Sequence, residues 1–156
     1  MRLLILIIIL TTTLQLSSQN INVVNFNNLE PYLSTESDTV FVVNFWATWC
    51  KPCVEELPGF FKLEEELKNE KFKLLLVSLD FASHIEQRVK PFIKKNKITT
   101  EVVVLDDPDA NIWINKVNPD WDGSIPITLI FNKKYSKFID SAIEYEELKE
   151  EVEKLK

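Results

Sequence analysis

The chain has 156 residues, of which 46% are apolar and 27% charged, and its formal net charge at pH 7 is −6. This balance is typical of one globular domain, and an acidic chain without a basic block has no electrostatic footprint for nucleic acid or an anionic membrane surface. The only glycines are Gly59 and Gly123, which argues against a glycine-rich phosphate-binding loop.

The N-terminus has the pattern of a secretory signal peptide. Arg2 precedes an unbroken apolar run over Leu3–Leu10, and small and polar residues follow. The run is well short of the roughly 20 apolar residues that span a bilayer. We therefore expect residues 1–18 to be a signal peptide and residues 19–156 to form one domain, with an uncleaved membrane anchor as the alternative. No cysteine lies in this stretch to receive a lipid.

From residue 20 onward, strand and helix patterns alternate. Apolar, β-branched runs predict buried strands, and apolar stripes at spacings of three and four predict amphipathic helices. After a short strand and a helix around Phe26–Leu33, the expected strands are Val40–Phe45, Phe72–Leu79, Val102–Leu105, Pro126–Phe131 and Tyr135–Asp140. The expected helices carry stripes at Leu57, Phe60, Leu63 and Leu67; at Ile85, Val89, Phe92 and Ile93; at Ala110, Trp113, Ile114 and Val117; and at Tyr145, Leu148, Val152 and Leu155.

Local signals refine this pattern. Pro58 and Gly59 predict a kink in one helix, Pro91 predicts a bend in the next, and Asp109 is placed to cap the third. After the N-terminal pair, the order is β-α-β-α-β-α-β-β-α. This order predicts parallel strands joined by crossover helices, completed by an antiparallel hairpin through a turn at Asn132–Lys134.

The two cysteines, Cys50 and Cys53, lie where a predicted buried strand ends and a helix begins. Because the chain has no other cysteine, no disulfide can tie distant parts of the fold together, and the pair is judged by its chemistry. Free N–H groups and the helix dipole stabilise a thiolate at a helix start, and Lys51 adds a positive charge. A second thiol one turn away can resolve a mixed disulfide, and Pro52 stiffens the turn.

Half of a zinc site is the alternative interpretation of the cysteine pair. Zinc takes four ligands, most often cysteine and histidine, and the only histidine of the chain is His84. We therefore expect no metal and no cofactor. His84 is expected to be an exposed residue at the start of a helix.

The junction around the cysteines reads FWATWCKPC over Phe45–Cys53 and is followed by Glu56 and Pro58, and Ile125–Pro126 precedes a later strand. Together these residues resemble the TlpA/ResA-like branch of the thioredoxin superfamily. The resemblance covers about residue 38 to the C-terminus. It implies a thioredoxin fold, an α/β domain with a central mixed β-sheet flanked by helices. It also implies that roughly Thr99–Asn118 is the β-α insertion of TlpA/ResA-like proteins.

The resemblance further implies roles for single residues. Cys50 would be the exposed nucleophile and Cys53 the resolving thiol of a redox-active disulfide. Pro126 would be cis and lie against the disulfide, and the backbone of Ile125 would pair with an extended substrate segment. Trp49 would flank the site and bind substrate, with a plain packing role as its alternative.

Two positions bear on how Cys53 loses its proton. Many thioredoxins carry a buried aspartate where this chain has Asn44, and an asparagine cannot accept a proton. Glu56 lies three residues beyond Cys53 on the same helix face and matches an acid common in the TlpA/ResA-like motif, which makes it a candidate catalytic residue. The alternative is an ordinary solvated acid in a first turn, where acids are favoured.

The leading hypothesis is an extracytoplasmic, periplasmic thiol–disulfide oxidoreductase. The resemblance implies that it reduces disulfides of exported proteins and is itself kept reduced by a membrane electron-donor protein. A peroxiredoxin-type peroxidase is one alternative, and Arg88 is the only arginine of the expected mature domain that could serve it. A redox-inert thioredoxin-like binding module is another. We expect a monomer that exchanges with exported protein disulfides or thiols and binds no nucleic acid.

Overall fold

The computed structural model describes residues 21–34 and 36–156, so the expected signal peptide lies outside the described residues. Within these two ranges, no helix combines the length and the apolar character that crossing a membrane requires.

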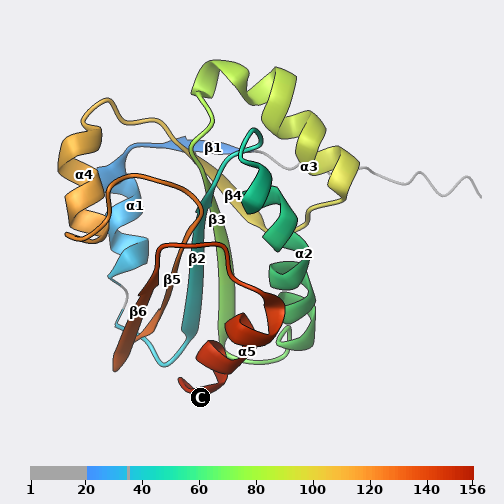
Figure 1. Cartoon of the computed structure of the whole chain (residues 1–156), viewed down its shortest axis with the longest axis vertical. Helices are drawn as coiled ribbons and strands as arrows, with labels where there is room; N and C mark the ends of the chain where they lie inside the picture. The colour runs from blue at the N-terminus through green and yellow to red at the C-terminus, as the bar shows by residue number, and fades with distance from the viewer. Residues whose placement is uncertain (1–20, 35) are drawn as a thin grey trace, which may run out of the picture.

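A mixed six-stranded sheet forms the centre of the fold (Figure 1). The strand order is β1-β4-β3-β2-β5-β6. Neighbours from β1 to β2 pair in parallel, whereas β5 runs antiparallel to both β2 and β6. The strands are β1 (Asn22–Val24), β2 (Val40–Trp46), β3 (Phe72–Ser78), β4 (Glu101–Leu105), β5 (Ile127–Asn132) and β6 (Tyr135–Ile139). This topology confirms the predicted parallel crossovers and the final antiparallel hairpin.

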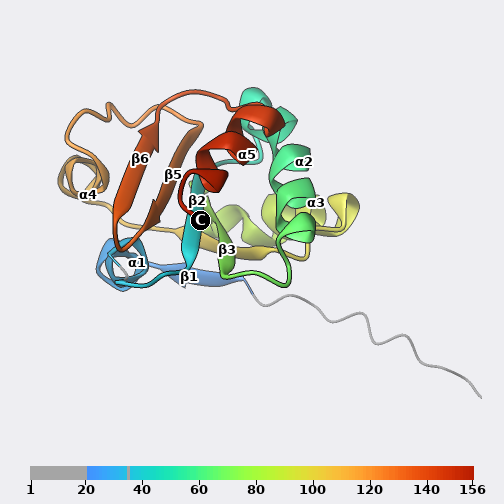
Figure 2. The same cartoon turned by 90° about the horizontal axis from the view of Figure 1, so that it is seen from below.

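Helices cover both faces of the sheet (Figure 2). One layer contains α1 (Phe26–Leu33) and α4 (Ala110–Val117), and the other contains α2 (Lys51–Glu66), α3 (Lys90–Asn96) and α5 (Tyr145–Glu153). Each layer packs its own apolar cluster against the sheet. The thioredoxin-like α/β fold that the sequence predicted is therefore present.

Strand β2 supplies side chains to both layers, because successive residues of a strand point to opposite faces. Val43 and Phe45 join the cluster under α1 and α4. Val42 and Trp46 join the cluster under α2, α3 and α5. Asn44 lies between these two and faces the α2 layer, where its amide contacts a side chain of that helix.

Helix α2 runs without a break through Pro58 and Gly59. The glycine has a packing reason, because a Cβ built at Gly59 would lie 3.2 Å from the Cβ of Tyr145, the first residue of α5. A side chain there would push α5 away from α2. Gly59 therefore lets these two helices approach closely.

The segment after β3 differs from the single bent helix that the sequence predicted. It contains a 3-10 turn at Ala82–His84, a π-helical turn at Ile85–Val89 and then α3. Pro91 lies in the first turn of α3, directly after the π-helical turn, and the helical backbone continues from that turn into α3 through Val89 and Lys90. His84 is half-buried rather than exposed, with its ring edge-on to that of Phe81.

The expected capping role of Asp109 is also wrong in part. Asp109 is the N-cap residue of α4, but its side chain makes no capping hydrogen bond. The nearby Asp107 is the ordering carboxylate, because it accepts hydrogen bonds from the backbone N–H of Phe26 at 2.9 Å and of Asp109 at 3.0 Å. These two bonds hold the pKa of Asp107 below its usual value.

Candidate active site

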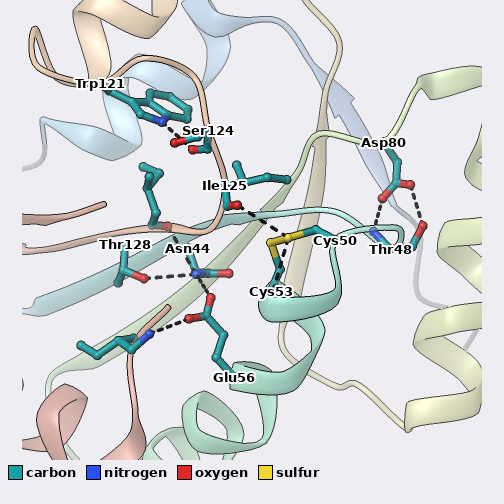
Figure 3. Close-up of a disulfide and its surroundings, with 12 residues drawn as sticks. Asn44, Thr48, Cys50, Cys53, Glu56, Asp80, Trp121, Ser124, Ile125 and Thr128 are labelled. Carbon is teal, nitrogen blue, oxygen red and sulfur yellow. Dashed lines mark hydrogen bonds between the residues drawn. A yellow bond between two sulfur atoms is a disulfide. The ribbon is translucent and has the colours of Figure 1, made fainter. Parts of the chain in front are cut away.

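Cys50 and Cys53 form a disulfide with an S–S distance of 2.03 Å, at the N-terminus of α2 (Figure 3). Cys50 is the N-cap residue, and its Sγ accepts a hydrogen bond from the backbone N–H of Cys53 at 3.3 Å. Cys50 is 6% exposed and Cys53 is fully buried. The expectation of an exposed Cys50 is therefore wrong for the disulfide form, although Cys50 remains the more accessible sulfur of the two.

The loop before β5 covers the disulfide on one side and explains this burial. The peptide bond between Ile125 and Pro126 is cis, as the resemblance implied, and Pro126 is buried. The carbonyl oxygen of Ile125 lies 3.8 Å from Cys50 Sγ (Figure 3). The indole Nε1 of Trp121 donates to the carbonyl of Ser124 at 2.7 Å, which fixes the approach of the loop.

A buried carboxylate, Asp80, fixes the turn that leads into Cys50. Asp80 is 1% exposed and accepts from the backbone N–H of Thr48 at 2.8 Å and from the Thr48 hydroxyl at 2.6 Å. It also accepts from the Ser78 hydroxyl at 2.9 Å. Sequence reasoning missed this carboxylate. The available signal was two polar residues at the end of a buried strand, because Ser78 is the last residue of β3 and Asp80 lies just beyond it. The carboxyl ends of parallel strands meet at one edge of a sheet.

Trp49 is exposed over 59% of its surface, so the alternative of a plain packing role is wrong. Phe81 is also exposed, over 69% of its surface. Trp49 follows Thr48 in the chain and Phe81 follows Asp80, and Thr48 and Asp80 are hydrogen-bonded to each other. The disulfide thus lies at an edge of the molecule that presents two apolar rings to solvent.

Glu56 is 8% exposed, which makes the solvated-acid alternative wrong. Its Oε1 accepts from Asn44 Nδ2 at 2.8 Å and its Oε2 accepts from the backbone N–H of Ile143 at 2.9 Å (Figure 3). Burial raises the pKa of Glu56 to about 7, although these two hydrogen bonds lower it and the charge of Glu144 raises it further. Glu56 lies in the second turn of α2 rather than in the first, and its carboxyl group titrates near neutral pH.

The amide of Asn44 ties α2 to β5. Besides its bond to Glu56, Asn44 Nδ2 donates to Thr128 Oγ1 at 3.1 Å and to the carbonyl of Ile127 at 3.3 Å. All of these groups are buried. Asn44, Glu56 and Thr128 therefore form one polar cluster beneath the N-terminal half of α2.

A zinc site would need more ligands than the cysteine pair supplies. In the part of the chain that the structure describes, there is no group of three or more histidine, cysteine, aspartate and glutamate side chains placed to hold a metal ion. The pair forms a disulfide in which the sulfur of Cys53 is fully buried and that of Cys50 is slightly more accessible.

Comparisons with known proteins place this geometry among relatives. The profile of the AhpC/TSA family matches residues 14–136. The chain is 36% identical over 63 residues to Sporulation thiol-disulfide oxidoreductase A of Bacillus subtilis, which covers 40% of this chain and 38% of the relative. It is 28% identical over 116 residues to Thiol-disulfide oxidoreductase ResA of Geobacillus thermodenitrificans, which covers 73% of this chain and 62% of the relative. The alignments thus span less than two thirds of each of these relatives.

Solved structures share the fold. StoA of Bacillus subtilis aligns with a TM-score of 0.55 at 28% identity, over 74% of this chain and 83% of that one. A thioredoxin-related protein from Neisseria meningitidis serogroup B aligns with a TM-score of 0.62 at 24% identity, over 78% of this chain and 87% of that one.

Proposed function

The chain belongs to the AhpC/TSA family and is a TlpA/ResA-like member of the thioredoxin superfamily, and from that premise we propose that it is a thiol–disulfide oxidoreductase working through Cys50 and Cys53. One observation carries the proposal. The Cys50–Cys53 disulfide lies at the N-terminus of α2, with its more accessible sulfur 3.8 Å from the backbone carbonyl of Ile125.

In the proposed reaction Cys50 is the nucleophile. Its thiolate attacks a substrate disulfide, a mixed disulfide forms, and one substrate sulfur leaves as a thiolate and takes up a proton. The thiolate of Cys53 then attacks Cys50 Sγ, which restores the disulfide seen here and releases the second substrate thiol. The substrate thus gains two electrons and two protons, and the cysteine pair loses them. The N–H of Cys53 and the start of α2 favour the Cys50 thiolate.

Trp49, Ile125 and Pro126 are the proposed substrate-binding residues. An extended segment that pairs with the backbone of Ile125 adds a strand beside the loop and brings its own disulfide to Cys50. The exposed ring of Trp49 offers apolar contact next to the nucleophile. This arrangement fits a polypeptide substrate, because it uses backbone pairing rather than an enclosed pocket.

Glu56 is the proposed acid–base group for Cys53. It lies one turn beyond Cys53 on the same face of α2, and its pKa of about 7 lets it take up and release a proton at neutral pH. Asn44 and the N–H of Ile143 hold its two oxygens in place.

The proposed location is outside the cytoplasm, where the protein acts as a monomer on exported protein disulfides or thiols and receives electrons from a membrane protein. The signal-like pattern of residues 1–18 supports export, and disulfides persist in oxidising compartments. The resemblance to TlpA/ResA-like proteins supports the reductive direction.

Reduction of insulin tests the activity directly. With dithiothreitol as the electron donor, the full chain is expected to accelerate precipitation of the insulin B chain, because Cys50 exchanges with protein disulfides faster than the donor alone. The double variant Cys50→Ala, Cys53→Ala is the control and should return the rate to that of the donor. Equal rates with and without the cysteines would favour the redox-inert binding module. Cysteine-dependent consumption of hydrogen peroxide, without insulin reduction, would favour the peroxidase.

A further inference from the structure

One polar atom of the cluster beneath α2 has no partner. Asn44 Nδ2 donates to three acceptors, but the amide oxygen Oδ1 is buried and accepts no hydrogen bond from residues 21–34 and 36–156. A buried acceptor that lacks a donor bears the full cost of its lost hydration, so such atoms are rare in folded proteins. The unpaired state of this oxygen therefore calls for a physical reason.

The position of the oxygen points to the cysteine pair. Asn44 faces the α2 layer, and the side of its amide that carries Nδ2 is directed to Glu56 and Thr128. In Figure 3 the oxygen points away from Thr128, toward the turn that holds the disulfide. Cys53 lies one turn before Glu56 on the same helix face and is, like Asn44, fully buried.

We propose that Asn44 Oδ1 is the hydrogen-bond acceptor for the Cys53 thiol in the reduced protein. This inference rests on the proposed function, because it requires that the disulfide be reduced. A thiolate of a reducing thiol attacks Cys50 Sγ, forms a mixed disulfide and expels the Cys53 thiolate, which takes up a proton. A second thiol attacks the mixed disulfide, becomes oxidised and releases Cys50. The new S–H of Cys53 is the donor that Oδ1 lacks in the disulfide form.

The proposed hydrogen bond from the Cys53 thiol to Asn44 Oδ1 is present in the reduced protein and absent in the disulfide form. Because the hydrogen bond forms only after reduction, it stabilises the dithiol relative to the disulfide. It also favours the protonated form of Cys53, because an amide oxygen accepts a hydrogen bond from a thiol and not from a thiolate. Two other titratable groups near Cys53 are on α2, namely Cys50 and Glu56. Asp80, which follows β3, accepts a hydrogen bond from Thr48, and the charge of Glu144, which precedes α5, raises the pKa of Glu56.

The test compares Asn44→Leu, which has a similar volume and no amide, with Thr128→Val as a matched control. Thr128→Val removes one acceptor from Nδ2 and leaves Oδ1 in place. We expect Asn44→Leu to lower the equilibrium constant for reduction of the full chain by glutathione about tenfold, which corresponds to a potential about 30 mV more negative. Thr128→Val should leave this constant within about twofold of the wild-type value, because its effect is confined to the donor side of the amide.

A second measurement needs no substitution of Asn44. In Cys50→Ser the thiol of Cys53 is the only one in the chain, and its S–H stretching band in the infrared should lie at lower frequency in the folded protein than in denaturant. A folded band at the frequency of a free thiol, or an unchanged glutathione equilibrium in Asn44→Leu, would overturn the inference. A wild-type protein that glutathione reduces but that does not reduce insulin would instead overturn the proposed function.

Discussion

Cys53→Ser is expected to accumulate mixed disulfides with substrate proteins, whereas Cys50→Ser traps almost none. The reason is the difference in accessibility at the start of α2, where Cys50 is 6% exposed and Cys53 is fully buried. With Cys53 replaced, the Cys50 thiolate still attacks a substrate disulfide, but no second thiol resolves the product. Both variants should lose catalysed insulin reduction completely. Non-reducing gel electrophoresis after rapid alkylation measures the trapped species.

The control for this experiment is the double variant, which has no thiol and should trap nothing. In the reduced wild-type protein, Cys50 should also react with an alkylating agent much faster than Cys53, because Cys50 is the N-cap residue of α2. Equal trapping by the two single variants would contradict the assignment of nucleophile and resolving thiol.

Glu56 is expected to make the oxidised protein less stable at pH 8 than at pH 5. Burial raises its pKa from the ordinary 4.5 to about 7, so between these values the folded protein holds a proton that the unfolded chain has released. The stabilisation is complete below the unfolded pKa and is lost as the pH rises through the folded pKa. At 1.36 kcal/mol for each pKa unit, the loss amounts to about 3 kcal/mol in the free energy of unfolding.

Urea unfolding of the wild-type protein and of Glu56→Gln at both pH values measures this effect. Glutamine is neutral throughout, so its variant should lack this part of the pH dependence. Glu64 provides a matched control, because desolvation also raises the pKa of this half-buried carboxyl group, which bonds the Thr100 hydroxyl. Glu64→Gln should remove only the smaller contribution of Glu64 to the pH dependence of the free energy of unfolding. If the free energy of unfolding changed equally between pH 5 and pH 8 in the wild type and in Glu56→Gln, the result would contradict a raised pKa of Glu56.

The sequence predicted the features that depend on neighbouring residues. The strand–helix junction at Cys50 is encoded within a few residues, and the order of strands follows from apolar runs that alternate with amphipathic stripes. Pairing in parallel between β2 and β3 was likewise predictable from that alternation. The cis bond before Pro126 was implied by the family resemblance and not by composition or periodicity.

The surroundings of the cysteines were harder to predict, because their partners come from distant parts of the chain. Glu56 accepts hydrogen bonds from the side chain of Asn44, twelve residues earlier, and from the backbone N–H of Ile143, 87 residues later. Its place near the start of a helix gave no sign of either contact. Asp80 accepts a hydrogen bond from Thr48, 32 residues earlier in the chain, and this contact depends on where β3 ends beside β2. Packing that follows from the whole fold therefore decided these environments.

The reduction potential of the Cys50–Cys53 pair is the measurement that tests the central claim most directly. The start of α2 stabilises the Cys50 thiolate and makes the disulfide more oxidising. Lys51 adds little, since its side chain is 84% exposed and pairs with Glu55 at 3.5 Å. The proposed reductive direction predicts a reduction potential of about −220 to −270 mV, the range of disulfide reductants, when the full chain is equilibrated with glutathione buffers. A value above about −180 mV, where isomerases and oxidases lie, or below about −300 mV, where structural disulfides lie, would contradict a disulfide reductase.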